Sequence, residues 1–175
     1  MIEKFFKIII NLKKIPRKGW KTKLGISNPE SVAEHVYSTS TIAMVFADMQ
    51  KLDTLKVLKM GLLHDLAESI IGDLTPEEIS KNEKVEHENK AITKIFSYLP
   101  QDLSNEYLSI WQEYQKRQTD EAILLHEIDK FEMAIQAINY YDEGIDKEKL
   151  KPFFDTAKNE INSKYIKEIL AKLLP

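Results

Sequence analysis

The chain has 175 residues, of which 43% are hydrophobic and 30% are charged, and its formal net charge is −3. This length and composition are typical of a single soluble domain with a buried core, and no apolar run approaches the ~20 residues that span a membrane. Because the sequence contains no cysteine, disulfides and thiolate nucleophiles or ligands are excluded. We therefore expect one cytoplasmic domain over residues 1–175, with neither a membrane nor a nucleic-acid polymer as its partner.

The basic residues are unevenly placed along the chain. Residues 4–29 contain eight Lys or Arg and no Asp or Glu, so the rest of the chain carries a net charge of −11, from 17 basic and 28 acidic residues. A basic segment on an acidic body suggests an anionic ligand near that segment, although charge alone slightly favours a solvated lysine-rich surface. One of the two arginines, Arg17, lies in the loop sequence PRKGW, and the planar guanidinium group suits a phosphate.

The N-terminal part is predicted to be a helix followed by a loop. Residues 2–13 alternate apolar and basic side chains at helical spacing, and the expected buried face consists of Phe5, Phe6, Ile9 and Leu12. Pro16 and Gly19 interrupt this pattern, so residues 14–30 are predicted to be an irregular loop. A loop of this length in a compact domain favours a functional role.

The next predicted helix begins after Ser31 and ends near Lys51. Ser31 is expected to cap it, and Glu34 is placed to close a capping box. The residues expected to face the core are His35, Thr39, Ile42, Phe46 and Met49. This pattern predicts an inward-pointing His35.

The remainder also reads as helical. Asp53 is predicted to cap a helix that ends near Ile71, and Gly61 inside it costs about 1 kcal/mol relative to alanine, so we expect a packing or access reason for it. The sequence Thr75-Pro76-Glu77-Glu78 is typical of a helix start. Further helices are predicted over residues 83–98, 102–116, 119–142, 147–159 and 163–173. The fold is therefore predicted to be all-α, a bundle of about six to eight helices.

A polar group interrupts the apolar stretch 57–76. In a continuous helix Glu68 would lie four residues after His64 and three after Asp65, so the three side chains would share one face. An imidazole and two carboxylates are costly to bury unless something offsets their polarity, and a divalent cation would do so. On its own, the His-Asp pair is weak evidence for a metal, and it favours a hydrogen-bonded core histidine.

Two residues elsewhere strengthen the metal hypothesis. Asp129, on the predicted 119–142 helix, shares a stripe with apolar residues, and alone it would be interpreted as a structural ion-pair residue. With His35, His64 and Asp65, however, it completes a set of two imidazoles and two carboxylates on three helices. Such a set can form a mixed nitrogen and oxygen site inside a bundle.

The order of these residues resembles the HD-domain metal-dependent phosphohydrolases. Five segments resemble the 5′-deoxynucleotidase branch of that family, the HD-domain-containing protein 2 group: R-K-G-W (17–20), P-E-S-V-A-E-H (29–35), L-L-H-D-L-A-E (62–68), G-D-L-T-P (72–76) and I-D-K-F-E-M-A-I-Q-A (128–137). They cover most of residues 17–137, the motif core. The C-terminal helices, within 147–174, are expected to complete the single HD domain.

The resemblance implies a role for each matching residue. The implied metal ligands are His35, His64, Asp65 and Asp129. Glu68 becomes the catalytic carboxylate and Asp73 a second acid at the mouth of the site. In some relatives these two acids also hold a further cation, together with the main-chain carbonyl at the position of Leu74.

The resemblance also implies the substrate contacts. Arg17, with the neighbouring Lys18, would bind the substrate phosphate, and Trp20 would help to shape the sugar pocket. One departure is that Lys18 and Gly19 separate the arginine from the tryptophan here, whereas some bacterial members have the two residues adjacent.

The implied activity is the hydrolysis of 2′-deoxynucleoside 5′-monophosphates, small-molecule substrates, to deoxynucleoside and phosphate. Mixed His and carboxylate ligation suits Mn²⁺, Co²⁺, Zn²⁺, Fe²⁺ or Ni²⁺ better than Mg²⁺, which prefers oxygen ligands. A homodimer is expected from the resemblance alone.

Two histidines leave alternatives open. His87 begins a polar stretch and is expected to be exposed, whereas His126 lies one turn before Asp129 and is a candidate to support the ligands. If both were ligands, the site would resemble the dinuclear HD proteins, which include cyclic-nucleotide phosphodiesterases and di-iron oxygenases. The non-enzyme alternative is a catalytically silent HD binding module. The presence of every motif acid and histidine argues against this alternative.

Overall fold

The computed structural model describes residues 1–175 as ten α-helices and one 3₁₀ turn, without a β-sheet. The helices are α1 (Ile2–Asn11), α2 (Lys18–Leu24), α3 (Val32–Gln50), α4 (Thr54–Leu63), α5 (Glu68–Ile71), α6 (Lys81–Phe96), α7 (Gln101–Lys116), α8 (Asp120–Asp142), α9 (Lys147–Glu160) and α10 (Lys164–Leu173). The all-α prediction is confirmed. The count exceeds six to eight because two short helices, α2 and α5, were not expected.

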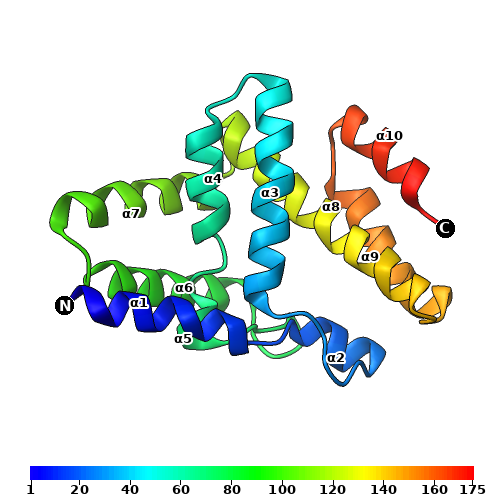
Figure 1. The fold of residues 1–175 in the computed structure, drawn as a ribbon, viewed down its shortest axis with the longest axis horizontal. Coiled ribbons are helices and arrows are strands. Elements are labelled where there is room, and N and C mark those ends of the chain that lie inside the picture. Colours follow the sequence, from blue (N-terminus) through cyan, green and yellow to red (C-terminus); the bar gives the residue numbers. More distant parts are fainter.

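Helix α3 organises the fold. It runs through the middle of the molecule, with α4 beside it and α8 crossing behind it, and both helices pack against it (Figure 1). Helix α9 packs on α8, while α1 and α6 lie at the other end of the molecule. One cluster of 36 buried hydrophobic residues joins these elements. Each large apolar side chain fully buried in it contributes about 1.5–3 kcal/mol to folding.

Local capping signals were predicted correctly. The Ser31 hydroxyl accepts from the Glu34 N–H and the Glu34 carboxylate accepts from the Ser31 N–H, so the capping box is complete. Asp53 and Thr119 cap α4 and α8 through their side chains. Each of these residues satisfies a backbone donor that the first helical turn leaves without a partner. These caps fix where the helices that carry the site begin.

The predicted burial of three residues is wrong. Phe6, Ile9 and Met49 are exposed, by 55%, 36% and 55% of their surface. In α1 the inward stripe is instead formed by Phe5 and the partly buried Ile8, and it continues to Leu12 in the 3₁₀ turn. Spacing alone did not decide which of two adjacent stripes faces the core.

The loop predicted over residues 14–30 contains helix α2. Gly25, with φ 71°, ends this helix in the left-handed conformation that glycine adopts without strain. Two main-chain hydrogen bonds close the base of the segment: Val32 N–H donates to the Ile15 carbonyl, and Arg17 N–H donates to the Glu30 carbonyl. Arg17 is therefore held beside the beginning of α3.

The predicted 53–71 helix is broken at the His-Asp pair. Helix α4 ends at Leu63, residues 64–67 form tight turns, and α5 begins at Glu68. Main-chain hydrogen bonds that span three residues mark the break. Leu66 N–H donates to the Leu63 carbonyl, and Glu68 N–H donates to the Asp65 carbonyl. The prediction of one continuous helix is wrong here, because these tighter turns replace the α-helical pattern.

The segment Thr75–Glu78 is a single turn and not the start of a helix. The Glu78 carboxylate accepts from the Thr75 N–H and hydroxyl, while Glu78 N–H donates to the Thr75 carbonyl. Helix α6 begins five residues later than Pro76, behind a Ser80 and Glu83 capping box. The stronger local cap decided the boundary.

Gly61 has the packing reason that was expected. A Cβ atom built at this position would lie 2.7 Å from Ser40 Oγ and 3.3 Å from Ser40 Cα, so α3 and α4 approach closely here. A larger residue would push the two helices apart.

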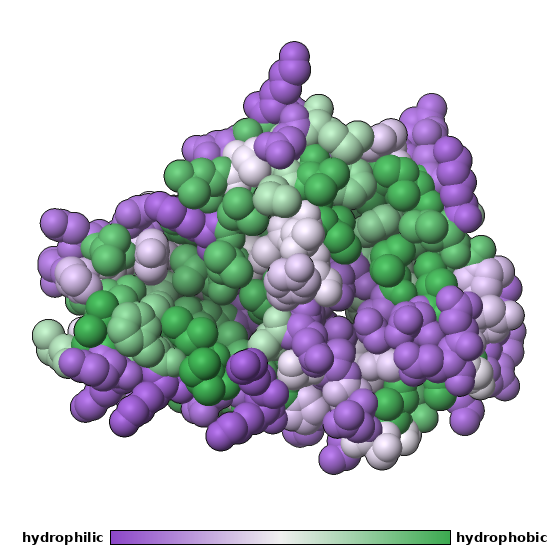
Figure 2. All heavy atoms as spheres, viewed as in Figure 1, coloured by the Kyte–Doolittle hydropathy of each residue, from purple (hydrophilic) through white to green (hydrophobic).

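No helix is both long and apolar enough to cross a membrane. Figure 2 shows hydrophobic residues gathered on both sides of a paler and polar strip on the face shown. Exposed apolar side chains include Val45 on α3 and Leu55 and Leu62 on α4.

Candidate active site

The candidate site is a cavity of about 520 Å³. It is bounded on one side by residues 17–23 and 64–76, and on the other by helices α6 to α9. Its lining includes eight of the residues singled out from the sequence: Arg17, Trp20, His64, Asp65, Glu68, Asp73, Leu74 and Asp129. The wall is mainly polar, since only six of its 26 residues are hydrophobic. Such a lining suits a charged ligand better than an apolar one.

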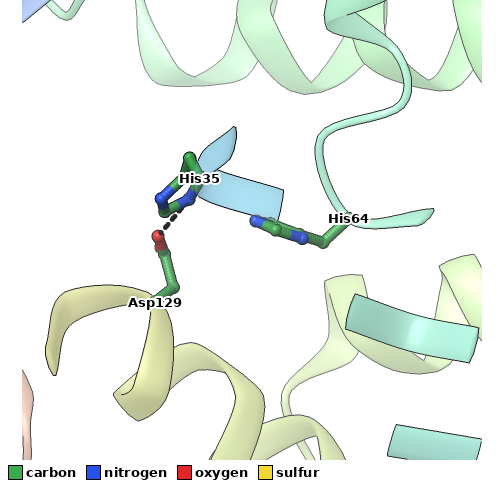
Figure 3. Close-up of side chains that lie close together, drawn as sticks. All are labelled: His35, His64 and Asp129. Atoms are coloured by element: carbon green, nitrogen blue, oxygen red, sulfur yellow. Dashed lines mark ion pairs between the residues drawn. The ribbon is translucent and has the colours of Figure 1, made fainter. Parts of the chain in front are cut away.

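Three side chains from three helical elements meet at the base of this cavity. Figure 3 shows His35 from α3, His64 just after α4 and Asp129 from α8 pointing toward one another. Each offers a ligand atom, and these atoms all lie within 4.8 Å of one another. The nearest pair is His35 Nε2 and Asp129 Oδ1, at 3.2 Å.

Asp65 adds a second carboxylate to this group. Its Oδ2 atom lies 3.3 Å from His64 Nε2 and 3.6 Å from His35 Nε2. The four residues predicted as metal ligands are therefore brought together in space, although they are separated by up to 94 positions in the sequence.

Each histidine is oriented by a hydrogen bond on its other ring nitrogen. His35 Nδ1 lies 2.6 Å from Glu132 Oε2, and His64 Nδ1 lies 2.6 Å from the Gly61 carbonyl oxygen. A carbonyl oxygen only accepts, so His64 must carry its proton on Nδ1. The same assignment for neutral His35 places the lone pairs of both Nε2 atoms toward the carboxylates.

A divalent cation fits this arrangement. His35 Nε2 and His64 Nε2 are buried and have no hydrogen-bond partner, a costly condition for polar atoms. Two imidazole nitrogens and carboxylates from Asp65 and Asp129 converge on the same place. This donor set is a common one for first-row divalent metals, and the hydrogen bonds on Nδ1 are the outer contacts that metal-binding histidines usually make.

The local electrostatics favour positive charge. Although burial and Arg17 lower the pKa of His35, the neighbouring carboxylates of Asp129 and Glu132 raise it to about 10. Burial opposes the charge of Asp129, but Lys130 and His35 hold its pKa well below the usual range. The raised pKa of His35 reflects the carboxylates around it, and the lowered pKa of Asp129 keeps that carboxylate ionised, so the base of the cavity attracts a proton or a metal cation.

Glu68 lies beside this group in a different environment. Its side chain is 3% exposed, and its Oε2 atom is buried without a hydrogen-bond partner. Burial raises the pKa of Glu68 well above its usual value, and the charges of Asp65 and Asp73 add to this shift. A carboxyl group with a raised pKa exchanges protons more readily near neutral pH. Glu68 thus has the character of an acid–base group.

Arg17 supplies a permanent positive charge to the wall. Its Nη1 atom lies 3.4 Å from Asp65 Oδ2, and the side chain is 17% exposed. Burial alone would lower the pKa of the guanidinium, but Asp65, Glu68 and other carboxylates raise it above its usual value. Arg17 therefore stays charged and faces the site.

The predicted second acid, Asp73, and the other predicted substrate residues, Lys18 and Trp20, occupy different places. Asp73 Oδ2 accepts from the Lys18 N–H at 2.6 Å, which links the 72–76 segment to the start of α2. The Lys18 ammonium pairs with Glu78, outside the cavity lining. Trp20 is 2% exposed, and its indole N–H donates to Glu30 Oε1 at 2.8 Å. Trp20 thus forms a packed wall of the cavity.

The remaining histidines are not part of the cluster. His87 is exposed, as predicted. His126 Nε2 lies 2.9 Å from the Tyr114 carbonyl, and its ring stacks on Tyr114 with centroids 4.0 Å apart. Burial lowers the pKa of His126 to about 4, so it is neutral at pH 7. Neither histidine belongs to a group that could hold a metal ion, so the geometry does not favour a dinuclear site.

Several residues of the site were missed from the sequence. Glu132 was not recognised as the partner of His35. Lys84 and Lys130 line the cavity and contact the acidic residues. The i, i+4 pair of Lys84 and Glu88 on α6 was the available signal, since both residues share a helix face.

Comparison with known proteins agrees with this geometry. A family model described as HD domain matches residues 9–170. The chain belongs to the HD domain family. The resemblance noted from the sequence is therefore confirmed.

Curated HD-domain relatives match over nearly the whole chain. A Dictyostelium discoideum protein named 5′-deoxynucleotidase HDDC2 is 37% identical, covering 97% of this chain and 94% of its own length. The human protein of the same name is 34% identical, with 97% and 82% covered.

Solved structures share the fold. A Pyrococcus horikoshii protein has a TM-score of 0.82 at 32% identity, covering 99% of this chain and 98% of the other. A Magnetospirillum magnetotacticum protein described as a predicted metal-dependent phosphohydrolase has a TM-score of 0.72 at 26% identity, with 98% and 90% covered.

Proposed function

We propose that this HD-domain protein is a metal-dependent 5′-deoxynucleotidase that hydrolyses 2′-deoxynucleoside 5′-monophosphates to deoxynucleoside and phosphate. The observation that carries the proposal is the four-residue cluster at the base of a polar cavity, in a chain whose full-length curated relatives are named 5′-deoxynucleotidases. A catalytically silent binding module would not need two buried imidazoles with free ring nitrogens.

The proposed ligands of the cation are His35, His64, Asp65 and Asp129. A bound divalent cation supplies Lewis acidity toward water and the phosphoryl oxygens. Mn²⁺, Co²⁺, Zn²⁺, Fe²⁺ and Ni²⁺ suit this mixed donor set better than Mg²⁺.

The residues around the cation divide the remaining work. In hydrolysis, a water oxygen forms a bond to phosphorus while the bond from phosphorus to the sugar oxygen O5′ breaks, and O5′ gains a proton. Glu68 can remove a proton from the water or give one to O5′, because it lines the cavity, its Oε2 has no hydrogen-bond partner and its pKa is raised by burial. Arg17 binds phosphate oxygens, and its charge stabilises the transition state.

The sugar specificity rests on the packed wall. Trp20 is fixed by its hydrogen bond to Glu30 and by contact with Phe153, at a ring centroid distance of 4.2 Å. A rigid wall excludes an extra hydroxyl group by shape, although an apolar wall alone discriminates by only about a hundredfold. We therefore expect deoxynucleotides to be hydrolysed well above ribonucleotides.

A substrate panel tests the proposal. The protein is stripped of metal with a chelator, restored with Mn²⁺, Co²⁺, Zn²⁺ or Mg²⁺, and assayed for phosphate release from deoxynucleotides, ribonucleotides, cyclic dinucleotides and guanosine tetraphosphate. We expect activity only with metal and mainly on deoxynucleoside monophosphates. His87→Ala is a matched control for His64→Ala, since it removes an exposed imidazole and should keep activity within a few-fold. Equal rates on both sugars would refute the substrate assignment.

We also propose a homodimer. The exposed apolar side chains on α3 and α4, Val45, Leu55 and Leu62 among them, support an interface on that side of the molecule. Sedimentation analysis of the purified protein measures its oligomeric state, and a monomer at micromolar protein concentration would contradict the proposal.

A further inference from the structure

Lys84 of α6 brings an ammonium group into the acidic side of the cavity. Its Nζ atom donates to the Leu74 carbonyl oxygen at 3.2 Å. The same atom lies 3.8 Å from Glu68 Oε1 and 3.8 Å from Glu88 Oε1. Three oxygen acceptors from three segments of the chain therefore surround one positive charge.

Two of these acceptors belong to the set that the family resemblance associates with a further cation. That set consists of Glu68, Asp73 and the Leu74 carbonyl. Lys84 contacts Glu68 and Leu74, and Asp73 Oδ2 is already engaged by the Lys18 N–H at 2.6 Å. One oxygen of each of the three groups thus has a partner within the chain itself.

A divalent ion at this position would meet the charge of Lys84 at close range. Two positive charges within a few ångströms repel strongly in a partly buried site. Glu68 Oε1, Asp73 Oδ2 and the Leu74 carbonyl oxygen would also have to release their present donors before these same atoms could coordinate an ion. The residues present therefore do not fit a second metal ion as well as they fit the ammonium group.

We propose that the Lys84 ammonium takes the place of a second divalent cation, so that this protein binds one metal ion per chain. The inference rests on the proposed metal-dependent function of the same site. Lys84 offsets the negative charge around Glu68. Unlike a bound metal ion, it cannot dissociate when free metal is scarce. It pairs with Glu68 at Oε1, and Glu68 Oε2 has no hydrogen-bond partner within the chain.

The position of Lys84 is built into the fold. Lys84 lies in the first turn of α6, directly behind the Ser80 and Glu83 capping box. Glu88 lies one turn further along the same helix and is 15% exposed. The helix therefore carries both the cation and one of its acceptors, and the cap fixes the register of the two.

Counting bound metal ions tests this inference without substrate. Metal-stripped protein is titrated with Mn²⁺, and the bound equivalents are measured by calorimetry and equilibrium dialysis. We expect one equivalent for the wild type and for Lys84→Arg, which keeps the charge. Lys84→Met removes the charge at similar length and should bind a second equivalent, more weakly than the first. Lys90→Met, on an exposed face of the same helix, is the matched control and should bind one.

The outcomes are distinct. Two equivalents on the wild type, or only one on Lys84→Met, would overturn the inference. Circular dichroism verifies folding, and Lys84→Gln replaces Lys84→Met if the latter fails to fold. Absence of deoxynucleotide hydrolysis with the expected counts would refute the proposed substrate and leave the inference on Lys84 standing.

Discussion

The base of the cavity and its rim are built in different ways. At the base, His35 and His64 are almost fully buried, and each is held by a hydrogen bond of 2.6 Å to a partner in the protein interior. At the rim, α2 is tied to the 73–78 segment by exposed ion pairs, Lys18 with Glu78 and Lys23 with Glu77. Only the bond from the Lys18 N–H to Asp73 is partly buried.

This difference separates two tasks. A buried hydrogen bond to a charged group contributes about 1.5–3 kcal/mol, and the loss of one partner leaves a costly unpaired group. Exposed ion pairs are screened by water and salt, and they hold a segment only loosely. The base is therefore suited to fixing a metal ion, and the rim is suited to admitting and releasing a substrate.

The largest expected effect lies where the two regions meet. Glu68→Gln keeps the size and hydrogen-bonding reach of the side chain but removes its ability to accept a proton. We expect the variant to fold and keep its metal, while kcat falls by about 10²–10⁴-fold, the usual contribution of general acid–base catalysis. KM should change far less, because Arg17 and the cation still bind the phosphate.

Steady-state phosphate release and metal content on the same preparation measure this. Turnover near the wild-type value would shift the catalytic role to Asp73. Loss of the metal would instead place Glu68 among the ligands and join it to the base of the cavity.

A smaller effect is expected from the support of the base. Glu132→Gln weakens the hydrogen bond that orients His35, and outer partners of this kind contribute about 10–100-fold to metal affinity. Calorimetric titration with Mn²⁺ measures the change. Glu143→Gln, at the exposed end of the same helix, is the control and should bind Mn²⁺ as the wild type does. Unchanged affinity in Glu132→Gln would show that His35 is oriented by packing alone.

The smallest effect is expected at the rim. Lys23→Met removes an ion pair with the exposed Glu77, and the urea midpoint of unfolding should not change measurably at low or high salt. Urea denaturation of Lys23→Met and Glu77→Gln, alone and combined, measures this. A clear loss of stability that disappears in high salt would mean that the rim is held as firmly as the base.

The sequence was most informative where the determinants are local. The caps at Ser31, Asp53 and Thr119 depend on residues three positions apart, so the helices that carry His35 and Asp129 could be predicted closely. Helix α2 was missed because Pro16 and Gly19 suggested a break, whereas Pro16 precedes the helix and Gly19 lies within its first turn.

The support of the site was less predictable than its ligands. The partners of His35 and Glu68, which are Glu132 and Lys84, lie 97 and 16 positions away. The i, i+4 pairing with Glu88 marks Lys84 as a helix-face residue, but no local pattern marks its contact with Glu68 or the contact of Glu132 with His35, since these depend on how α3, α6 and α8 pack. The break after Leu63 was missed for a similar reason, because an apolar pattern does not distinguish an α-turn from the tighter turns at residues 64–67.

The hydrogen bonds that orient the imidazoles of His35 and His64 also differ in how a substitution can affect them. The atom that orients His35 belongs to the side chain of Glu132, so a single codon change can remove it. The atom that orients His64 is the main-chain oxygen of residue 61, which every amino acid supplies. A Cβ atom at residue 61 would lie 2.7 Å from Ser40 Oγ, so a larger residue there would have to displace Ser40 or its helix. A single substitution can therefore remove the hydrogen-bond partner of His35 directly. The partner of His64 is lost only if the main chain at residue 61 moves.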